Sequence, residues 1–86
     1  MKMWGKIWKN NHLVRDIVVS DDSSDTRTHK VLHLLEEICL SFDLSRPIWL
    51  DSGIRDFQLH KRVRFGKDCF IEEVDFDYLE MLVLEE

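Results

Sequence analysis

Apolar and polar side chains alternate along the first 19 residues and predict a β-hairpin. Residues 3–9 and 12–19 alternate as strands do, and Asn10-Asn11 between them suits a tight type I′ turn because asparagine tolerates positive φ. A two-residue loop gives three cross-strand pairs on one face: Trp8 with Leu13, Lys6 with Arg15, and Trp4 with Ile17. The other face then carries four apolar side chains: Met3, Ile7, Val14 and Val18. We expect one face to meet the core and the other a partner or the C-terminal strand.

The spacing of apolar residues changes after residue 25 and predicts an amphipathic helix over residues 26–42. Apolar side chains recur there at intervals of three and four, at Val31, Leu32, Leu34, Leu35, Ile38, Cys39 and Phe42. The acidic and serine-rich loop at residues 21–25 supplies an N-cap and suits the positive end of the helix dipole. The helix must end before Arg46-Pro47, since proline disfavours helical geometry in the residue before it.

The remaining segments complete a small mixed domain. Residues 47–50 are predicted as a short apolar strand, and a short helix at residues 54–60 follows a cap at Asp51-Ser52. Residues 63–65 are extended or loop, and Asp68 caps a single helical turn. Residues 74–84 form the last strand, whose second half is apolar on both faces, as is typical of a central position in a sheet.

These elements predict the α+β class with the order β-β-α-β-α-β. The expected architecture is a small antiparallel or mixed sheet with one long and one short helix packed on one face. At 86 residues the chain is one domain, residues 1–86. The other face of the sheet, which carries Trp4 or Trp8, would stay free for water, a partner or a second copy.

Three carboxylates near the C-terminus are expected to stand in a row. The alternating run Val74-Asp75-Phe76-Asp77-Tyr78 places Glu73, Asp75 and Asp77 on one face of one strand. Such a row could hold Mg²⁺ or Mn²⁺ and serve a phosphohydrolase. A solvated strand face explains the same alternation, so no metal and no cofactor is predicted. The row is kept as a patch to test for a cation or a basic partner.

The net charge of −5 conceals two basic segments, residues 1–15 and 61–67, neither of which contains an acid. The overall acidity argues against nucleic acid covering the whole surface, but not against a local basic face. His29 and His33 lie four apart on the predicted helix without a His-Glu-x-x-His motif, so zinc is not predicted. Two distant cysteines, with no leader or membrane-spanning segment, predict a cytoplasmic protein.

The tryptophans of the hairpin lie beside basic residues and indicate a binding surface. Tryptophan and arginine are enriched at the centres of protein interfaces. The residues singled out for a partner are Trp4, Trp8, Arg15, Arg62 and Arg64. We predict a non-enzymatic interaction or regulatory module that self-associates and binds no membrane. Single-stranded nucleic-acid binding by the basic hairpin is the second hypothesis, and the Mg²⁺ or Mn²⁺ phosphohydrolase is the third.

Several blocks of sequence resemble a family of short, functionally uncharacterised bacterial proteins from Gram-positive anaerobes. The blocks are Asp25-Thr26-Arg27-Thr28-His29-Lys30, Pro47-Ile48-Trp49-Leu50-Asp51, Phe70-Ile71-Glu72 and Asp75-Phe76-Asp77-Tyr78-Leu79-Glu80. The resemblance covers nearly the whole chain, including the opening Met3-Trp4-Gly5-Lys6-Ile7. It implies a free-standing bacterial cytoplasmic domain and carries over no functional residues.

Overall fold

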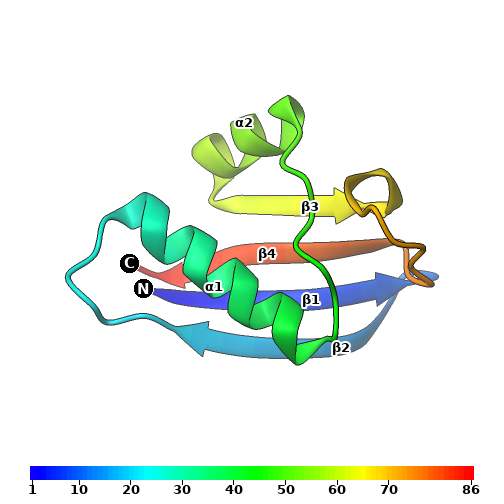
Figure 1. The fold of residues 1–86 in the computed structure, drawn as a ribbon, viewed down its shortest axis with the longest axis horizontal. Coiled ribbons are helices and arrows are strands. Elements are labelled where there is room, and N and C mark those ends of the chain that lie inside the picture. The colour runs from blue at the N-terminus through cyan, green and yellow to red at the C-terminus, as the bar shows by residue number, and fades with distance from the viewer.

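Four strands form one antiparallel sheet in the computed structural model, which describes all residues 1–86 (Figure 1). The strands are β1 Lys2–Lys9, β2 His12–Ser20, β3 Arg62–Gly66 and β4 Tyr78–Glu85. They lie in the order β2-β1-β4-β3, so the last strand takes the central position expected from its apolar faces. The predicted α+β class is confirmed. The order of elements along the chain is β-β-α-α-β-β, which differs from the predicted order in the placement of the third strand.

The hairpin turn forms as predicted, but a β-bulge changes the register beyond it. Asn10 and Asn11 have φ angles of 52° and 64°, the positive values that a type I′ turn requires. Trp8 pairs with Leu13, as expected. The next partners are Ile7 and Arg15, so that Val14 is an extra residue in β2.

The bulge overturns the two other predicted pairs of the hairpin. Lys6 pairs with Asp16 and Trp4 pairs with Val18. A shift of one residue moves side chains to the opposite face of a strand. Ile17 therefore packs against the core, whereas Val18 lies on the outer face beside Trp4 and is 48% exposed.

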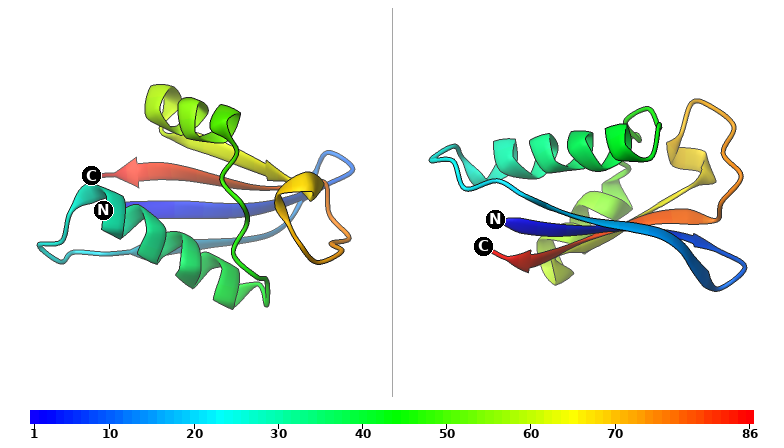
Figure 2. Two further views of the ribbon diagram at one scale, coloured as in Figure 1. Left: turned by 45° about the horizontal axis from the view of Figure 1, so that its top comes forward. Right: turned by 90° about the horizontal axis from the view of Figure 1, so that it is seen from below.

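Helix α1, Arg27–Ser41, covers one face of the sheet (Figure 2). The hydroxyl of Thr26 caps it by accepting a hydrogen bond from the backbone N–H of His29 at 3.2 Å. Its apolar stripe is buried in one core together with the odd-numbered residues of β1 and β4. The fully buried centre of this core consists of Met3, Leu34, Ile38, Cys39, Val63, Phe65, Leu79 and Met81.

Helix α2, Asp51–His60, lies beside β3 and buries Phe57 (Figure 1). Residues 47–50 precede it and do not form the predicted strand. Their apolar character serves packing instead, because the Trp49 ring lies edge-on to Phe57 and Phe65, with centroids at 5.8 and 4.9 Å. The third strand of the sheet is β3, in the segment that was expected to be extended or loop.

The segment between β3 and β4 also differs from the sequence-based prediction. A short 3-10 turn, η1 Lys67–Cys69, forms where Asp68 was expected to begin a helical turn. Residues 74–77 are a loop, and β4 begins only at Tyr78. The alternation in this loop arises because one apolar side chain is buried between exposed acids. The Phe76 ring packs edge-on against Phe70, with centroids 5.5 Å apart. The part of the predicted strand that would have carried the acidic row is therefore a loop, and only residues from Tyr78 onward form the strand.

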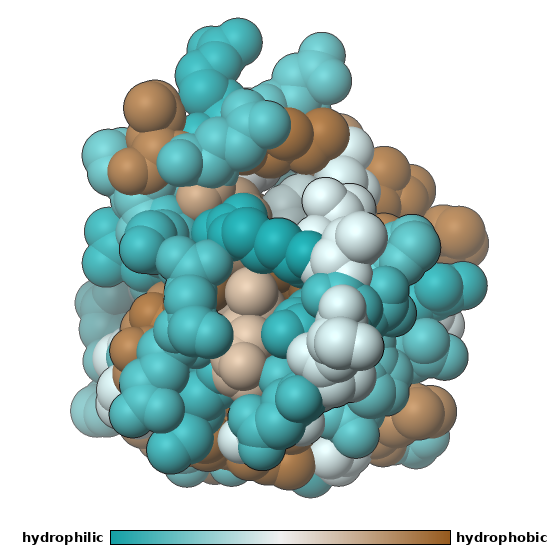
Figure 3. All heavy atoms as spheres, turned by 90° about the vertical axis from the view of Figure 1, so that its left-hand side faces the viewer, coloured by the Kyte–Doolittle hydropathy of each residue, from teal (hydrophilic) through white to brown (hydrophobic).

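Both termini lie at one end of the sheet (Figure 1). Figure 3 views this end, where hydrophilic residues surround a small hydrophobic centre. The Met1 ammonium donates to the backbone oxygen of Asp21 at 2.8 Å. Glu86 pairs with Arg27 of α1 and with Lys61, which follows α2, so the last residue ties both helices to the end of β4. No helix combines the length and the apolar character needed to cross a membrane.

Candidate functional site on the open sheet face

The side of the sheet opposite α1 carries no helix over β1, β2 and β4, and we call it the open face (Figure 2). Its side chains come from alternate residues of all four strands. They include Lys2, Trp4, Lys6, Trp8, Leu13, Asp16, Val18, Arg62, Arg64, Tyr78, Glu80, Leu82 and Glu85. The paired residues form three rows that run across the strands. Two rows contain aromatic rings, and a charged row lies between them.

The charged row alternates in sign across the four strands. Arg64 of β3 pairs with Glu80 of β4, Glu80 pairs with Lys6 of β1, and Lys6 pairs with Asp16 of β2. Directly opposed residues on neighbouring strands have side chains in contact range, and opposite charges there are stabilising. The row therefore holds the sheet together on the face where no helix covers it.

Glu80 is the centre of this row and the one charged residue that is buried, at 4% exposure. Its carboxylate accepts hydrogen bonds from the indole N–H of Trp8 and the Nε of Arg64, both at 3.2 Å. The Lys6 ammonium lies 3.7 Å away and Arg62 Nε lies 3.9 Å away. A buried carboxylate is stable only when it is paired and hydrogen-bonded, and Glu80 meets both conditions.

The aromatic rings on either side are fixed by the same charges. The Lys6 ammonium lies 3.7 Å from the Trp4 ring centroid, and the Arg64 guanidinium lies 5.0 Å from that of Tyr78. Trp8 and Tyr78 are neighbours, with centroids 6.4 Å apart. The Trp4 indole N–H donates to Asp16 at 2.9 Å. The rings are therefore held in place in the free protein, which lowers the entropy cost of binding a partner.

Four of the five predicted partner-binding residues come together on the open face: Trp4, Trp8, Arg62 and Arg64. Arg15 does not, because the bulge turns it to the α1 side, where its guanidinium lies 4.8 Å from the Phe42 ring. Tyr78 and Glu80 also belong to the face and were not among the residues predicted from the sequence. Their alternation with buried Leu79 and Met81 could have identified them.

The predicted acidic row does not form. Glu73, Asp75 and Asp77 lie in the loop before β4, and Asp77 instead accepts a hydrogen bond from the backbone N–H of Asn10 at 2.9 Å. No group of three His, Cys, Asp or Glu side chains is arranged to hold a metal ion. The basic residues after α2 do not reach these acids, since Lys61 pairs with Glu86, and Arg62 and Arg64 pair with Glu80.

The two helix histidines each pair with an acid in the loop before α1. His29 Nδ1 lies 3.0 Å from Asp25, and His33 Nδ1 lies 3.1 Å from Asp21. Hydrogen bonds from Ser23 and then from His33 hold the pKa of Asp21 well below its usual range. The bond to Asp21 in turn raises the pKa of His33. These pairs fasten the loop to the helix.

Both cysteines are buried, free thiols. Burial raises the pKa of Cys39 to about 11 and also raises that of Cys69. A thiol with a raised pKa holds little thiolate at neutral pH and is a poor nucleophile. Neither residue contributes to the open face.

The chain was compared with protein-family models, curated proteins and solved structures, and none of them matches it.

Proposed function

We propose that this protein is a non-enzymatic interaction module that binds a second copy of itself through the open face. The observation that carries the proposal is the charged row of alternating sign, with the ordered rings of Trp8 and Tyr78 on one side and that of Trp4 on the other. Trp, Tyr and Arg are the residue types that dominate binding energy in protein interfaces. The free thiols of Cys39 and Cys69 support a reducing, cytoplasmic setting.

The distribution of charge favours an interface in which two copies of the chain meet through the open face over one in which they meet through any other surface. Lys2, Lys6, Arg62 and Arg64 on the open face are nearly balanced by three carboxylates, Asp16, Glu80 and Glu85. The whole chain carries a net charge of −5, so the rest of the surface is strongly acidic. Two copies that meet through the open face keep their acidic surfaces apart, whereas other contacts bring them together.

The charged row is complementary to itself. A two-fold axis parallel to the strands, placed between two facing sheets, reverses the order of the strands across the interface. Arg64 of one copy then lies over Asp16 of the second copy, and Asp16 over Arg64. Both side chains are exposed and on edge strands. Arg64 uses only its Nε on Glu80, and Asp16 uses only one carboxylate oxygen on Trp4, so each has further atoms for an intermolecular ion pair. Facing sheets pack with their strands within about 30° of each other, which keeps a central row aligned.

Apolar side chains supply the attraction that ion pairs alone would not. In the same arrangement Trp8 of one copy lies over Tyr78 of the second copy, and Trp4 lies over Leu82. Val18 is 48% exposed and Leu13 is 43% exposed, and both become covered at the rim. Burial of such surface is the main favourable contribution to association.

The proposal is tested with two variants that reverse one charge each, Asp16→Lys and Arg64→Glu. We expect the wild-type protein to sediment as a dimer toward the upper end of a series from about 5 to about 500 µM. Each variant alone places like charges opposite each other and should weaken the dimer by about tenfold or more. An equimolar mixture of the two variants restores both ion pairs, so the heterodimer should form.

Arg55→Glu is the matched control for Arg64→Glu, because it makes the same change of charge on the exposed surface of α2. It should leave the dimer unchanged. Thermal melts of all variants check that they are folded. Sedimentation of the wild type as a monomer at every concentration, or a mixture that stays monomeric when the single variants do, would contradict the proposal.

Single-stranded nucleic acid is the second candidate for the same surface. It is favoured by the Trp8 and Tyr78 rings beside Arg64, since bases stack on aromatic side chains and arginine contacts phosphates. It is disfavoured by Glu80, which already engages Lys6, Arg62 and Arg64. A labelled oligothymidine should then bind with an affinity that falls steeply as salt rises. Binding that is absent, or independent of salt, would exclude this candidate.

A further inference from the structure

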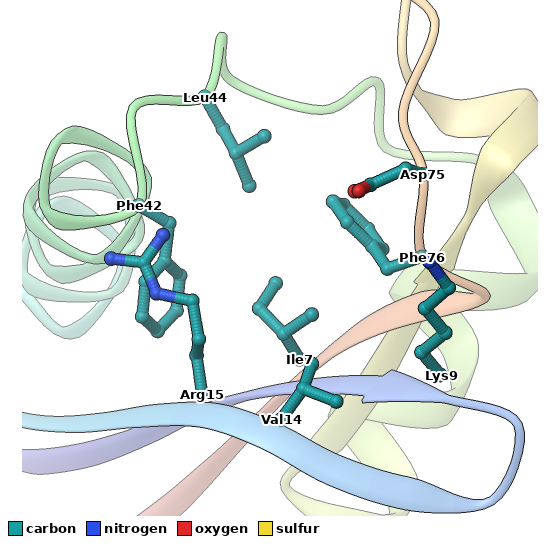
Figure 4. Close-up of a pocket in the computed structure, with 8 residues that line it drawn as sticks. All are labelled: Ile7, Lys9, Val14, Arg15, Phe42, Leu44, Asp75 and Phe76. Carbon is teal, nitrogen blue, oxygen red and sulfur yellow. The ribbon is translucent and has the colours of Figure 1, made fainter.

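A pocket of about 400 Å³ opens at the hairpin end of the molecule, on the α1 side of the sheet (Figure 4). Its floor is apolar and comes from three separate parts of the chain: Ile7 of β1, Phe42 and Leu44 just after α1, and Phe76 of the loop before β4. Three of these residues are buried, and Leu44 points into the space from the loop after α1. A volume of this size with an apolar lining and a few polar groups is typical of sites for small molecules.

The bulge in β2 builds one wall of this pocket. In a regular strand Val14 and Arg15 would point to opposite faces, but both line the pocket here. Bulges are over-represented at sheet edges, where β2 lies, and next to active sites, where they redirect a side chain. The guanidinium of Arg15 is held over the Phe42 ring and donates one hydrogen bond, at 3.2 Å, to the backbone oxygen of Ser41 at the end of α1.

The charges around the pocket leave Arg15 without a counter-ion. Lys9 and Asp75 stand on the opposite wall, where the carboxylate points toward the space and the ammonium rises beside it (Figure 4). These two charges offset each other. No carboxylate of the chain pairs with Arg15, whose only hydrogen-bond partner is a carbonyl oxygen, and four of its five N–H donors remain free.

We infer that this pocket binds a small amphipathic monocarboxylate, with its apolar body on the floor and its carboxylate on Arg15. A planar guanidinium binds a carboxylate through two parallel hydrogen bonds, and such charge-assisted bonds are strong. The single unbalanced positive charge selects a monoanion over a neutral or cationic molecule. This site lies on the opposite side of the sheet from the open face and is independent of the function proposed above.

Three compounds of equal size that differ only in their end group test the inference: 4-phenylbutyrate, 4-phenylbutanol and 4-phenylbutylamine. Binding is followed by NMR through the methyl signals of Ile7, Val14 and Leu44. We expect the carboxylate to bind with a Kd of about 1 mM or tighter. The alcohol should bind about tenfold more weakly and the amine more weakly still, because neither can pair with Arg15.

Two variants separate the contribution of charge from that of the cavity. Arg15→Gln should weaken binding of the carboxylate by about tenfold and leave binding of the alcohol unchanged. Val14→Phe should fill the space and weaken binding of all three compounds. Arg55→Gln, which removes an exposed arginine of α2, should change nothing. Equal affinity of the wild-type protein for all three compounds, shifts confined to other methyl groups, or no binding at about 10 mM would overturn the inference.

Discussion

Gly5 of β1 lies directly beneath Ile38 of α1. A Cβ atom placed on Gly5 would lie 2.6 Å from Cγ2 of Ile38, closer than real side chains approach each other. Ile38 is fully buried, so it has little room to move. The absence of a side chain at residue 5 is therefore what allows α1 to sit so close to the middle of the sheet.

Gly5→Ala should lower the free energy of unfolding by about 1–3 kcal/mol, because the added methyl group overpacks the core. Ile38→Ala alone should also be destabilising, by about 2–5 kcal/mol. In the double variant the new methyl group occupies part of the space that Ile38 vacates. The decrease in the free energy of unfolding of the double variant, measured by urea denaturation, should therefore be smaller than the sum of the decreases in the two single variants. Strict additivity would show that the two residues do not share this space.

Glu80 should contribute more to stability than any other acid of the open face. Glu80→Ala leaves Lys6, Arg62 and Arg64 without their shared carboxylate and should lower the free energy of unfolding by about 2 kcal/mol. Glu85→Ala removes an exposed carboxylate that lies 3.8 Å from Lys2 and should cost about 0.5 kcal/mol or less. Chemical denaturation of both variants measures the difference. Equal losses would contradict the central role of Glu80.

Stability should be greatest between about pH 4 and about pH 6.5. The raised pKa of His33 means that its stabilising effect is complete below its usual value of 6.5 and is lost as the pH rises through the raised value. Lys61 and Arg27 lower the pKa of Glu86 to about 2, and Ser23 and His33 lower that of Asp21. Their stabilising effect is complete above the usual carboxylate values and is lost as the pH falls toward the lowered ones.

Urea denaturation at a series of pH values measures this profile. His33→Gln should remove most of the decline above about pH 6.5 and leave a decline at acid pH, since the ion pairs of Glu86 are unaffected. His12→Gln, at the exposed start of β2, is the control and should retain the wild-type profile. An unchanged alkaline decline in His33→Gln would assign it to another group.

Glycine should be able to replace the turn residue Asn11 without loss of stability, whereas alanine should not. Its φ of 64° lies in the left-handed region, which costs most residues about 1–2 kcal/mol. Asn11→Ala should therefore lower the free energy of unfolding by about 1 kcal/mol. Asn11→Gly should be neutral or slightly stabilising, because Asn-Gly is the preferred type I′ pair. Denaturation midpoints of the two variants that coincide would show that the turn has relaxed.

The elements that depend on local sequence could be predicted, and those that depend on distant contacts could not. The turn at Asn10-Asn11 and helix α1 follow from backbone preferences and from the spacing of apolar residues. Residues 47–50 are apolar because they pack against distant parts of the chain, and not because they pair as a strand. Ile48 makes one backbone hydrogen bond, to Cys69 at 2.7 Å, and Trp49 packs against rings that are far away in the sequence.

The candidate site could be predicted in part. Trp4, Trp8, Arg62 and Arg64 were identified by residue type, since Trp and Arg favour interfaces. The position of Glu80 at their centre depends on β4 inserting between β1 and β3, which no local pattern indicates. The misplacement of Arg15 and the loss of the acidic row have a common origin. Period-two alternation cannot reveal a bulge or distinguish a strand from a loop with one buried ring.

Because Val14 is an extra residue in β2, the number of residues in this strand determines whether the bulge forms. Removing Val14 alone would restore a regular strand and leave the rest of the segment unchanged. A relative one residue shorter in β2 would thus retain the hairpin and its tryptophans but lack a wall of the pocket. An alignment that closes such a gap would conceal the difference, so ligand-binding relatives should be sought by counting residues between the turn and Asp16.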